Sequence, residues 1–208
     1  MAKDPKTLHD AFIDELRDLY NAEKQITKAL PKMIKAANAS PLSDAFQSHL
    51  KETEGQIKRL EQVFESLGEP AKSKTCDGMA GIIEEGKHLM EEDFDDATMD
   101  ACLIAAAQKV EHYEIGSYGT VIAWAEAMGH DEAVRLLKIT LGEEEATDEK
   151  LSSLATGGIN DEAASIAHGE EQEEDDEEET AMVGAGRKAA PSRAAASRGR
   201  QANSRGRR

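Results

Sequence analysis

Apolar side chains recur every three or four residues along four long segments of this 208-residue chain. This spacing places them on one face of an α-helix, and such a helix is stable when that face is buried against other helices. Valine and isoleucine are sparse, and no Asn-Gly or Asp-Gly pair lies between two alternating apolar runs, so β-hairpins are not expected. The pattern predicts an all-α fold built around four long helices.

Turn signals predict where these helices begin and end. Asp4-Pro5 and Ser40-Pro41 are start signals, because proline is tolerated at the first helical position. Gly68, Gly129 and the pair Gly157-Gly158 follow periodic segments, where glycine commonly ends a helix. We expect two antiparallel hairpins joined by a long crossover that contains a short helix. The expected long helices cover about residues 5–37, 41–67, 98–128 and 131–155, and the short one about 79–91.

Acidic side chains interrupt the apolar stripe of each long helix. Burying several ionised carboxylates together is very unfavourable unless protons or cations compensate. The core stripes contain no basic residue, and the nearest ones, Arg17, Lys28 and Lys109, lie off those stripes. A metal site is therefore expected, with these candidate ligands: Glu23 on the first helix, His49 and Glu52 on the second, Glu111 and Glu114 on the third, and Glu144 and Asp148 on the fourth.

The depth of the acids along the bundle tests whether they can meet. Glu114 and Glu144 lie fifteen and thirteen residues from the turn between the third and fourth helices, so they come level in an antiparallel hairpin. Glu23 and Glu52 lie fifteen and eleven residues from the turn between the first two helices, which also brings them roughly level. The sequence therefore predicts one carboxylate-rich centre, and oxygen ligands with one imidazole suit a dinuclear iron or manganese site.

Other interpretations stay open for several of these side chains. Glu23 can also be a surface acid, with Glu15 as the alternative ligand on the first helix. His49 is equally consistent with a hydrogen-bonded core histidine. His112 is a candidate partner of the centre or an exposed residue. Three tyrosines either donate hydrogen bonds to the carboxylates or only pack in the core: Tyr20, Tyr113 and Tyr118.

Four stretches of the sequence carry a family resemblance: DELRDLYNAEKQ at 14–25, GQIKRL at 55–60, VEHYEI at 110–115 and ATDEKL at 146–151. Together they resemble the YciE/YciF family of ferritin-like bacterial stress proteins, over about residues 6–155. The resemblance implies a rubrerythrin-like four-helix bundle with a carboxylate-rich dimetal site, assembled as a homodimer. The expected ferritin-like domain covers residues 1–158.

The ligand pattern departs from the usual ferritin-like one, in which two helices carry Glu-x-x-His. Here the second helix has the reversed order His49-x-x-Glu52, the third has Glu111-x-x-Glu114, and the fourth has Glu144. Most ligands would then be oxygens. Iron and manganese are the expected metals, with zinc and magnesium less strongly excluded.

Residues 159–208 are expected to form a disordered tail. Residues 161–180 hold 11 acidic and no basic side chains, and residues 181–208 hold 8 basic and no acidic ones. Such charge blocks lack an apolar face and cannot offset the entropy of ordering. The arginines among alanine, serine and glycine resemble an arm that contacts nucleic-acid phosphates, although a merely solubilising tail fits as well.

Two functions follow from these features. A dimetal centre predicts an oxidoreductase of the ferroxidase or peroxidase type, which oxidises ferrous iron or removes peroxide and, as a peroxidase, needs a separate electron-donor protein. The alternative is a non-catalytic scaffold whose arginine-rich tail binds nucleic acid. The chain has no apolar run of about 18 residues and no basic-then-apolar start, so no membrane association is expected and the cytoplasm is the expected location.

Overall fold

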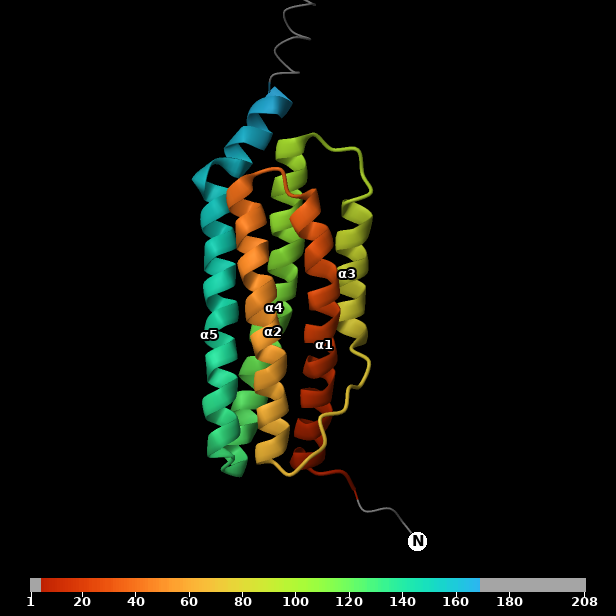
Figure 1. The fold of residues 1–208 in the computed structure, drawn as a ribbon, viewed down its shortest axis with the longest axis vertical. Coiled ribbons are helices and arrows are strands. Elements are labelled where there is room, and N and C mark those ends of the chain that lie inside the picture. The colour runs from red at the N-terminus through yellow and green to blue at the C-terminus, as the bar shows by residue number, and fades with distance from the viewer. Residues whose placement is uncertain (1–4, 169–208) are drawn as a thin grey trace, which may run out of the picture. The chain divides into compact units, whose positions relative to one another are not determined.

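The computed structural model describes residues 5–168, so residues 169–208 of the predicted tail, with most of its acidic and all of its arginine-rich part, lie outside the described residues. Four long helices form an antiparallel bundle (Figure 1), and no strand occurs within the described range. The long helices are α1 (Leu8–Ala36), α2 (Ser40–Ser66), α4 (Asp96–Met128) and α5 (Asp131–Leu154), and the short helix α3 (Asp77–Leu89) lies in the crossover.

The connections follow the predicted topology. α1 and α2 form one hairpin, α4 and α5 form the other, and the crossover runs from the end of α2 back along the bundle to the start of α4 (Figure 1). α3 packs against α1 and α4 on the outside of the bundle. The ferritin-like all-α fold, including its short crossover helix, is confirmed. None of the helices in the described residues is long and apolar enough to cross a membrane.

The first helix begins later than Asp4-Pro5 predicts. Thr7 is its N-cap, and its side chain accepts a hydrogen bond from the backbone N–H of Asp10. The Asp10 carboxylate in turn accepts from the backbone N–H of Thr7 at 2.8 Å. This capping box satisfies two backbone donors that would otherwise lack partners, which explains why the helix starts here. Gly129 ends α4 as predicted, with a φ of 75° that favours glycine.

The glycine pair at 157–158 does not end the last helix, contrary to the prediction. The chain passes through a π-helical turn (Ala155–Ile159), in which Gly158 has a φ of 136°, and residues 160–168 are again helical. Ala155 is buried and Ile159 packs against the core, so apolar contacts on both sides of the glycine pair favour continued helix. The prediction of a disordered tail is therefore wrong for residues 159–168.

Buried apolar side chains form two clusters that are separated along the bundle. The first contains residues 12–20 of α1 and 60–64 of α2, and the second contains residues 22–30 of α1 and 42–46 of α2. α4 and α5 contribute to both clusters in the same way. Between the clusters lies a set of buried polar side chains, hereafter the polar layer: Glu23, His49, Thr53, Gln56, Glu111, Glu114, Thr140 and Glu144.

Candidate metal centre

Four side chains of the polar layer come together closely enough to hold an ion. Each of them offers one ligand atom, and these atoms all lie within 4.8 Å of one another. All four side chains are buried. They come from three helices, since α2 supplies one, α4 two and α5 one. We call this group the acid cluster: His49, Glu111, Glu114 and Glu144.

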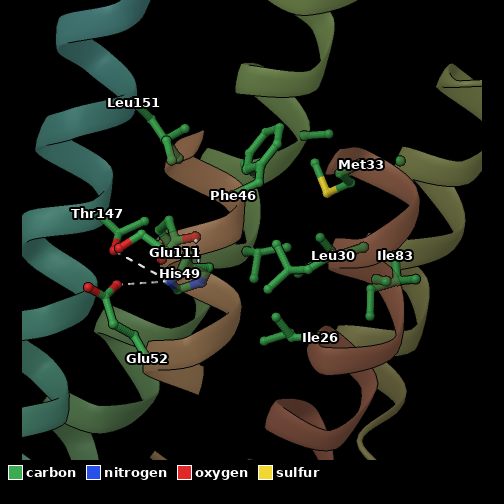
Figure 2. A pocket seen from close by; sticks show the side chains of 18 of the residues that line it. Ile26, Leu30, Met33, Phe46, His49, Glu52, Ile83, Glu111, Thr147 and Leu151 are labelled. Atoms are coloured by element: carbon green, nitrogen blue, oxygen red, sulfur yellow. Dashed lines mark hydrogen bonds and ion pairs between the residues drawn. The ribbon is translucent and has the colours of Figure 1, made fainter. Parts of the chain in front are cut away.

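The imidazole of His49 lies between the three carboxylates of the acid cluster and the surface. Its Nε2 is 3.4 Å from Oε1 of Glu111, while its Nδ1 is 3.4 Å from the hydroxyl of Thr147 and 3.8 Å from Glu52 (Figure 2). The outward nitrogen therefore has polar neighbours that can orient the ring. The inward nitrogen makes no hydrogen bond within the described residues and points toward the carboxylates.

Many carboxylate oxygens of the polar layer are buried without a hydrogen-bond partner. Both oxygens of Glu114 and of Glu144 are in this state within the described part of the chain, as are Oε2 of Glu111 and Oε2 of Glu23. An unsatisfied buried polar atom costs about 1–3 kcal/mol, and more when it is charged. A bound cation would satisfy several of these atoms at once, so the residues present fit a metal.

Burial raises the pKa of every one of these acids. The pKa values of Glu23, Glu111 and Glu114 lie well above the ordinary value of 4.5, first because of burial and then because of neighbouring carboxylates. The pKa of Glu144 is also raised by burial, although the charge of nearby His49 lowers it in part. Burial therefore favours the protonated form of these acids, and a bound cation would favour the ionised form.

Glu23 is the acid that α1 contributes to the polar layer. It is fully buried, and the hydroxyl of Tyr118 donates a hydrogen bond to its Oε1 at 2.5 Å. Its pKa is raised by burial and by the carboxylate of Glu144. Glu15, the alternative on the same helix, is only partly buried and does not belong to the polar layer.

Glu52 and Asp148 lie at the edge of the acid cluster and are not part of it. The side chain of Glu52 is 43% exposed, and its interaction with His49, 3.8 Å away, lowers its pKa. Asp148 accepts a hydrogen bond from Gln108 at 3.1 Å and lies 3.2 Å from the exposed ring of His112. These two acids contact histidines and amides and do not converge on the four ligand atoms.

Of the three tyrosines considered from the sequence, Tyr118 alone donates to an acid of the polar layer among the described residues. The hydroxyl of Tyr20 donates to Glu61 at 2.6 Å, on the outer side of α2. The hydroxyl of Tyr113 donates to Asp18 and lies 3.1 Å from the sulfur of Cys76. The sequence pattern alone could not distinguish these three positions.

A polar network next to the acid cluster was missed in the sequence. Arg59 forms two hydrogen bonds to the carboxylate of Glu143, at 2.8 and 2.9 Å, and a third to Thr140 at 2.7 Å. Gln56 also donates to Glu143, at 3.2 Å. Gln56 lies on the apolar stripe of α2, and Arg59 follows it by three residues, about one helical turn. This spacing is the signal from which Arg59 could have been found.

Because Glu143 engages the guanidinium of Arg59, this base does not neutralise the acid cluster. No lysine or arginine of the described residues forms an ion pair with a carboxylate of the cluster or with Glu23. As the sequence predicts, ion pairs with lysine or arginine do not compensate the charge of these acids. Protons or a bound cation are the remaining means of compensation.

An antiparallel four-helix bundle with a long crossover, carrying buried carboxylates and an imidazole at one level, defines a ferritin-like protein. The sequence matches the model of a family described as a domain of unknown function (DUF892) over residues 7–164. It is 50% identical over 163 residues to protein YciF of Escherichia coli K12, covering 78% of this chain and 98% of that protein. The chain belongs to this family, the YciE/YciF family.

Solved structures agree with this assignment. The E. coli stress protein YciF superposes with a TM-score of 0.72 at 50% identity, over 75% of this chain and 99% of that one. YcfI of Rhodopseudomonas palustris gives 0.71 at 48% identity, over 74% and 98%. A protein of Xanthomonas campestris at 18% identity gives 0.59, over 79% and 99%, and shares the fold.

Proposed function

We propose that this chain is a stress-associated metalloprotein that binds a dinuclear iron or manganese site in its polar layer. The observation that carries the proposal is the convergence of four buried ligand atoms within 4.8 Å, among carboxylate oxygens that have no hydrogen-bond partner in the part of the chain that the structure describes. The E. coli relative is named a stress protein, which supports the same setting here.

The acid cluster would supply most of the ligands. His49, Glu111, Glu114 and Glu144 would hold the metal. Glu23 would add a ligand through Oε2, while its Oε1 keeps the hydrogen bond from Tyr118. Glu52 and Asp148 would act at the edge, where Glu52 orients the His49 ring.

A pair of iron or manganese ions, when bound, supplies electrons for the reduction of oxygen or peroxide. We infer an oxidoreductase of the ferroxidase or peroxidase type, in which ferrous iron or a separate electron-donor protein is the source of those electrons. The chain contributes a buried site, because the two apolar clusters of the core lie on either side of the polar layer. Burial also raises the pKa of Glu111 and Glu114, so metal binding would compete with protonation of these acids.

Metal content tests this proposal directly. We would measure iron and manganese by elemental mass spectrometry in protein purified without chelator, beside a Glu114→Gln and Glu144→Gln double variant. The matched control is Glu145→Gln with Glu149→Gln, two exposed acids of α5. About two ions per chain, kept in the control and lost in the cluster variant, are expected. Equal metal content in all three proteins would disprove the site.

Activity is tested on the same three proteins. Loss of added ferrous iron or of hydrogen peroxide is followed over time in wild type, cluster variant and control. We expect turnover in the wild type and the control alone. If the wild type binds metal but consumes neither substrate, the oxidoreductase proposal is wrong and the protein is a metal-stabilised scaffold.

A scaffold of this kind is the second candidate function. The arginine-rich residues beyond 181 favour it, because such a segment can contact phosphates. Removing residues 181–208 should then lower affinity for duplex DNA at low salt, and an unchanged affinity would disprove nucleic-acid binding by this segment. We propose a homodimer as the assembly in either case, which sedimentation analysis would test.

A further inference from the structure

A cavity of about 550 Å³ opens beside the polar layer, and the metal centre does not account for it. Its walls are mostly aliphatic and come from all five helices (Figure 2). Ile26 and Leu30 of α1 and Ile83 of α3 line one side, and Phe46 of α2 and Leu151 of α5 line the other. A cavity of this size and character is typical of sites that bind small organic molecules.

The cavity reaches the acid cluster. His49 and Glu111 belong to its lining, together with Thr147 and Glu52, which contact the His49 ring. Figure 2 shows these four side chains together, across the cavity from Ile26 and Ile83. An occupant of the cavity would therefore have one end next to the candidate metal centre.

The charges that line the cavity are distributed unevenly. Lys28 and Lys32 of α1 and Lys87 of α3 lie at one rim, and Lys32 and Lys87 also line a shallow depression beside it, with Lys35 and Glu91. Lys87 pairs with Glu84 at 3.0 Å. Within the described residues, Lys28 and Lys32 have no ion pair.

The acids that line the cavity belong to α2, α4 and α5. Glu143 is paired with Arg59, Glu52 lies beside His49 and within the field of Lys150, and Glu111 faces His49 and belongs to the acid cluster. The rim formed by α1 and α3 is therefore basic.

We propose that this cavity binds a free amphiphilic organic anion, an aliphatic carboxylate. Its chain would lie among Ile26, Leu30 and Ile83, where apolar surface is removed from water. Its carboxylate would meet the ammonium groups of Lys28 and Lys32 at the rim, which form no ion pair with any residue of 5–168. The site uses no metal ligand for recognition, so it stands apart from the proposed metal chemistry.

Calorimetric titration of the full-length protein tests the proposal. The protein is first freed of metal and of bound lipid, and decanoate is added below its micelle concentration. Decyltrimethylammonium is the matched probe, because its alkyl chain is of nearly the same length and its charge is opposite. We expect one decanoate per chain, with an affinity at least about tenfold higher than that of the ammonium compound.

Two variants locate the site. Lys28→Glu with Lys32→Glu should weaken decanoate binding by about tenfold or more, since both rim charges are reversed. The control, Lys51→Glu with Lys58→Glu, changes the net charge equally on exposed positions of α2 outside the lining and should bind as the wild type does. Ala29→Phe should abolish binding by filling the cavity, with its thermal unfolding measured in parallel.

Three results would overturn the proposal: no saturable binding of decanoate, equal binding of the ammonium compound, or equal binding by the charge-reversed variant and the wild type. Because the surface variant leaves the core intact, a folding defect in the Ala29 variant would not hide the answer. Metal content is measured separately, so failure here leaves the metal site standing.

Discussion

His49 on α2 and Glu111 on α4 face each other across the middle of the bundle, with Nε2 of the imidazole 3.4 Å from Oε1 of the carboxylate. Both side chains are buried, and α2 and α4 are not consecutive helices in the sequence. On the far side of the ring, Thr147 and Glu52 contact Nδ1. The imidazole is thus oriented with its free nitrogen toward the acid cluster, as a metal ligand requires.

Removing this imidazole should weaken metal binding more than removing the acid that orients it. His49→Ala takes away a ligand from the acid cluster, and we expect a loss of about a hundredfold in manganese affinity. Glu52→Gln keeps the ligand and alters only its outer partner, so about tenfold is expected. Titration followed by electron paramagnetic resonance measures both, and a larger effect of Glu52→Gln would contradict the assignment.

The stability of the metal-free protein should fall as the pH rises. The pKa values of Glu23, Glu111 and Glu114 are raised by burial, so the folded state binds more protons than the unfolded state does above pH 4.5. The stabilisation is complete below 4.5 and is lost as the pH passes through the raised values. Urea unfolding between pH 5 and 8 measures this trend, and stability that rises over this range would contradict it.

Manganese should reverse that trend. The metal binds the deprotonated acids, so its affinity increases with pH and its stabilisation grows in the range where the metal-free protein weakens. The same urea titrations with excess manganese provide the measurement. The Glu114→Gln and Glu144→Gln double variant is the control: manganese should not stabilise it, and its pH dependence should be weaker, because only Glu23 and Glu111 keep their raised pKa values.

Tyr118→Phe should lower the free energy of unfolding by about 1–3 kcal/mol, because Oε1 of fully buried Glu23 would lose its hydrogen bond. Tyr20→Phe is the matched change, since its hydroxyl bonds to Glu61 at a partly exposed position. We expect a smaller loss there. Denaturant unfolding of the metal-free proteins compares the two variants. Equal losses in the free energy of unfolding would mean that the buried hydrogen bond contributes no more than the partly exposed one.

Arg59→Gln should raise the pH at which metal binds. The charge of Arg59 lowers the pKa of Glu23 in part, so its removal favours the protonated form of that acid. The change also leaves Glu143 without its bidentate partner, which costs about 1 kcal/mol for a partly exposed pair. Manganese binding followed across pH tests this, with Arg135→Gln, an exposed base of α5, as control.

Two glycines, Gly116 inside α4 and Gly129 at its C-cap, test why this helix ends where it does. Gly129→Ala should cost about 1 kcal/mol, because a φ of 75° is unfavourable for alanine. Gly116→Ala should instead stabilise by up to about 1 kcal/mol, since this exposed glycine is helical and its added methyl group meets open space. Thermal unfolding measures both, and changes of the same sign would contradict the expectation.

The sequence alone determined the class of fold and the level at which the acids lie. Spacings of three and four residues depend only on helix geometry, so the stripes placed Glu23, Glu114 and Glu144 in the core, where the structure finds them buried. Gly129 was predicted as a helix end for an equally local reason, the left-handed φ that glycine adopts freely. The α1 start was wrong because Thr7 and Asp10 form a stronger local cap than Asp4-Pro5.

Tertiary structure decided which of these side chains converge. Periodicity gives the face of a helix and its depth, but the rotation of one helix against another depends on packing throughout the core. That packing turned Glu52 and Asp148 to the edge, brought Tyr118 onto Glu23, and engaged Arg59 with Glu143. It also carried the last helix past Gly158, because contacts of Ala155 and Ile159 with the rest of the bundle outweigh a local stop signal.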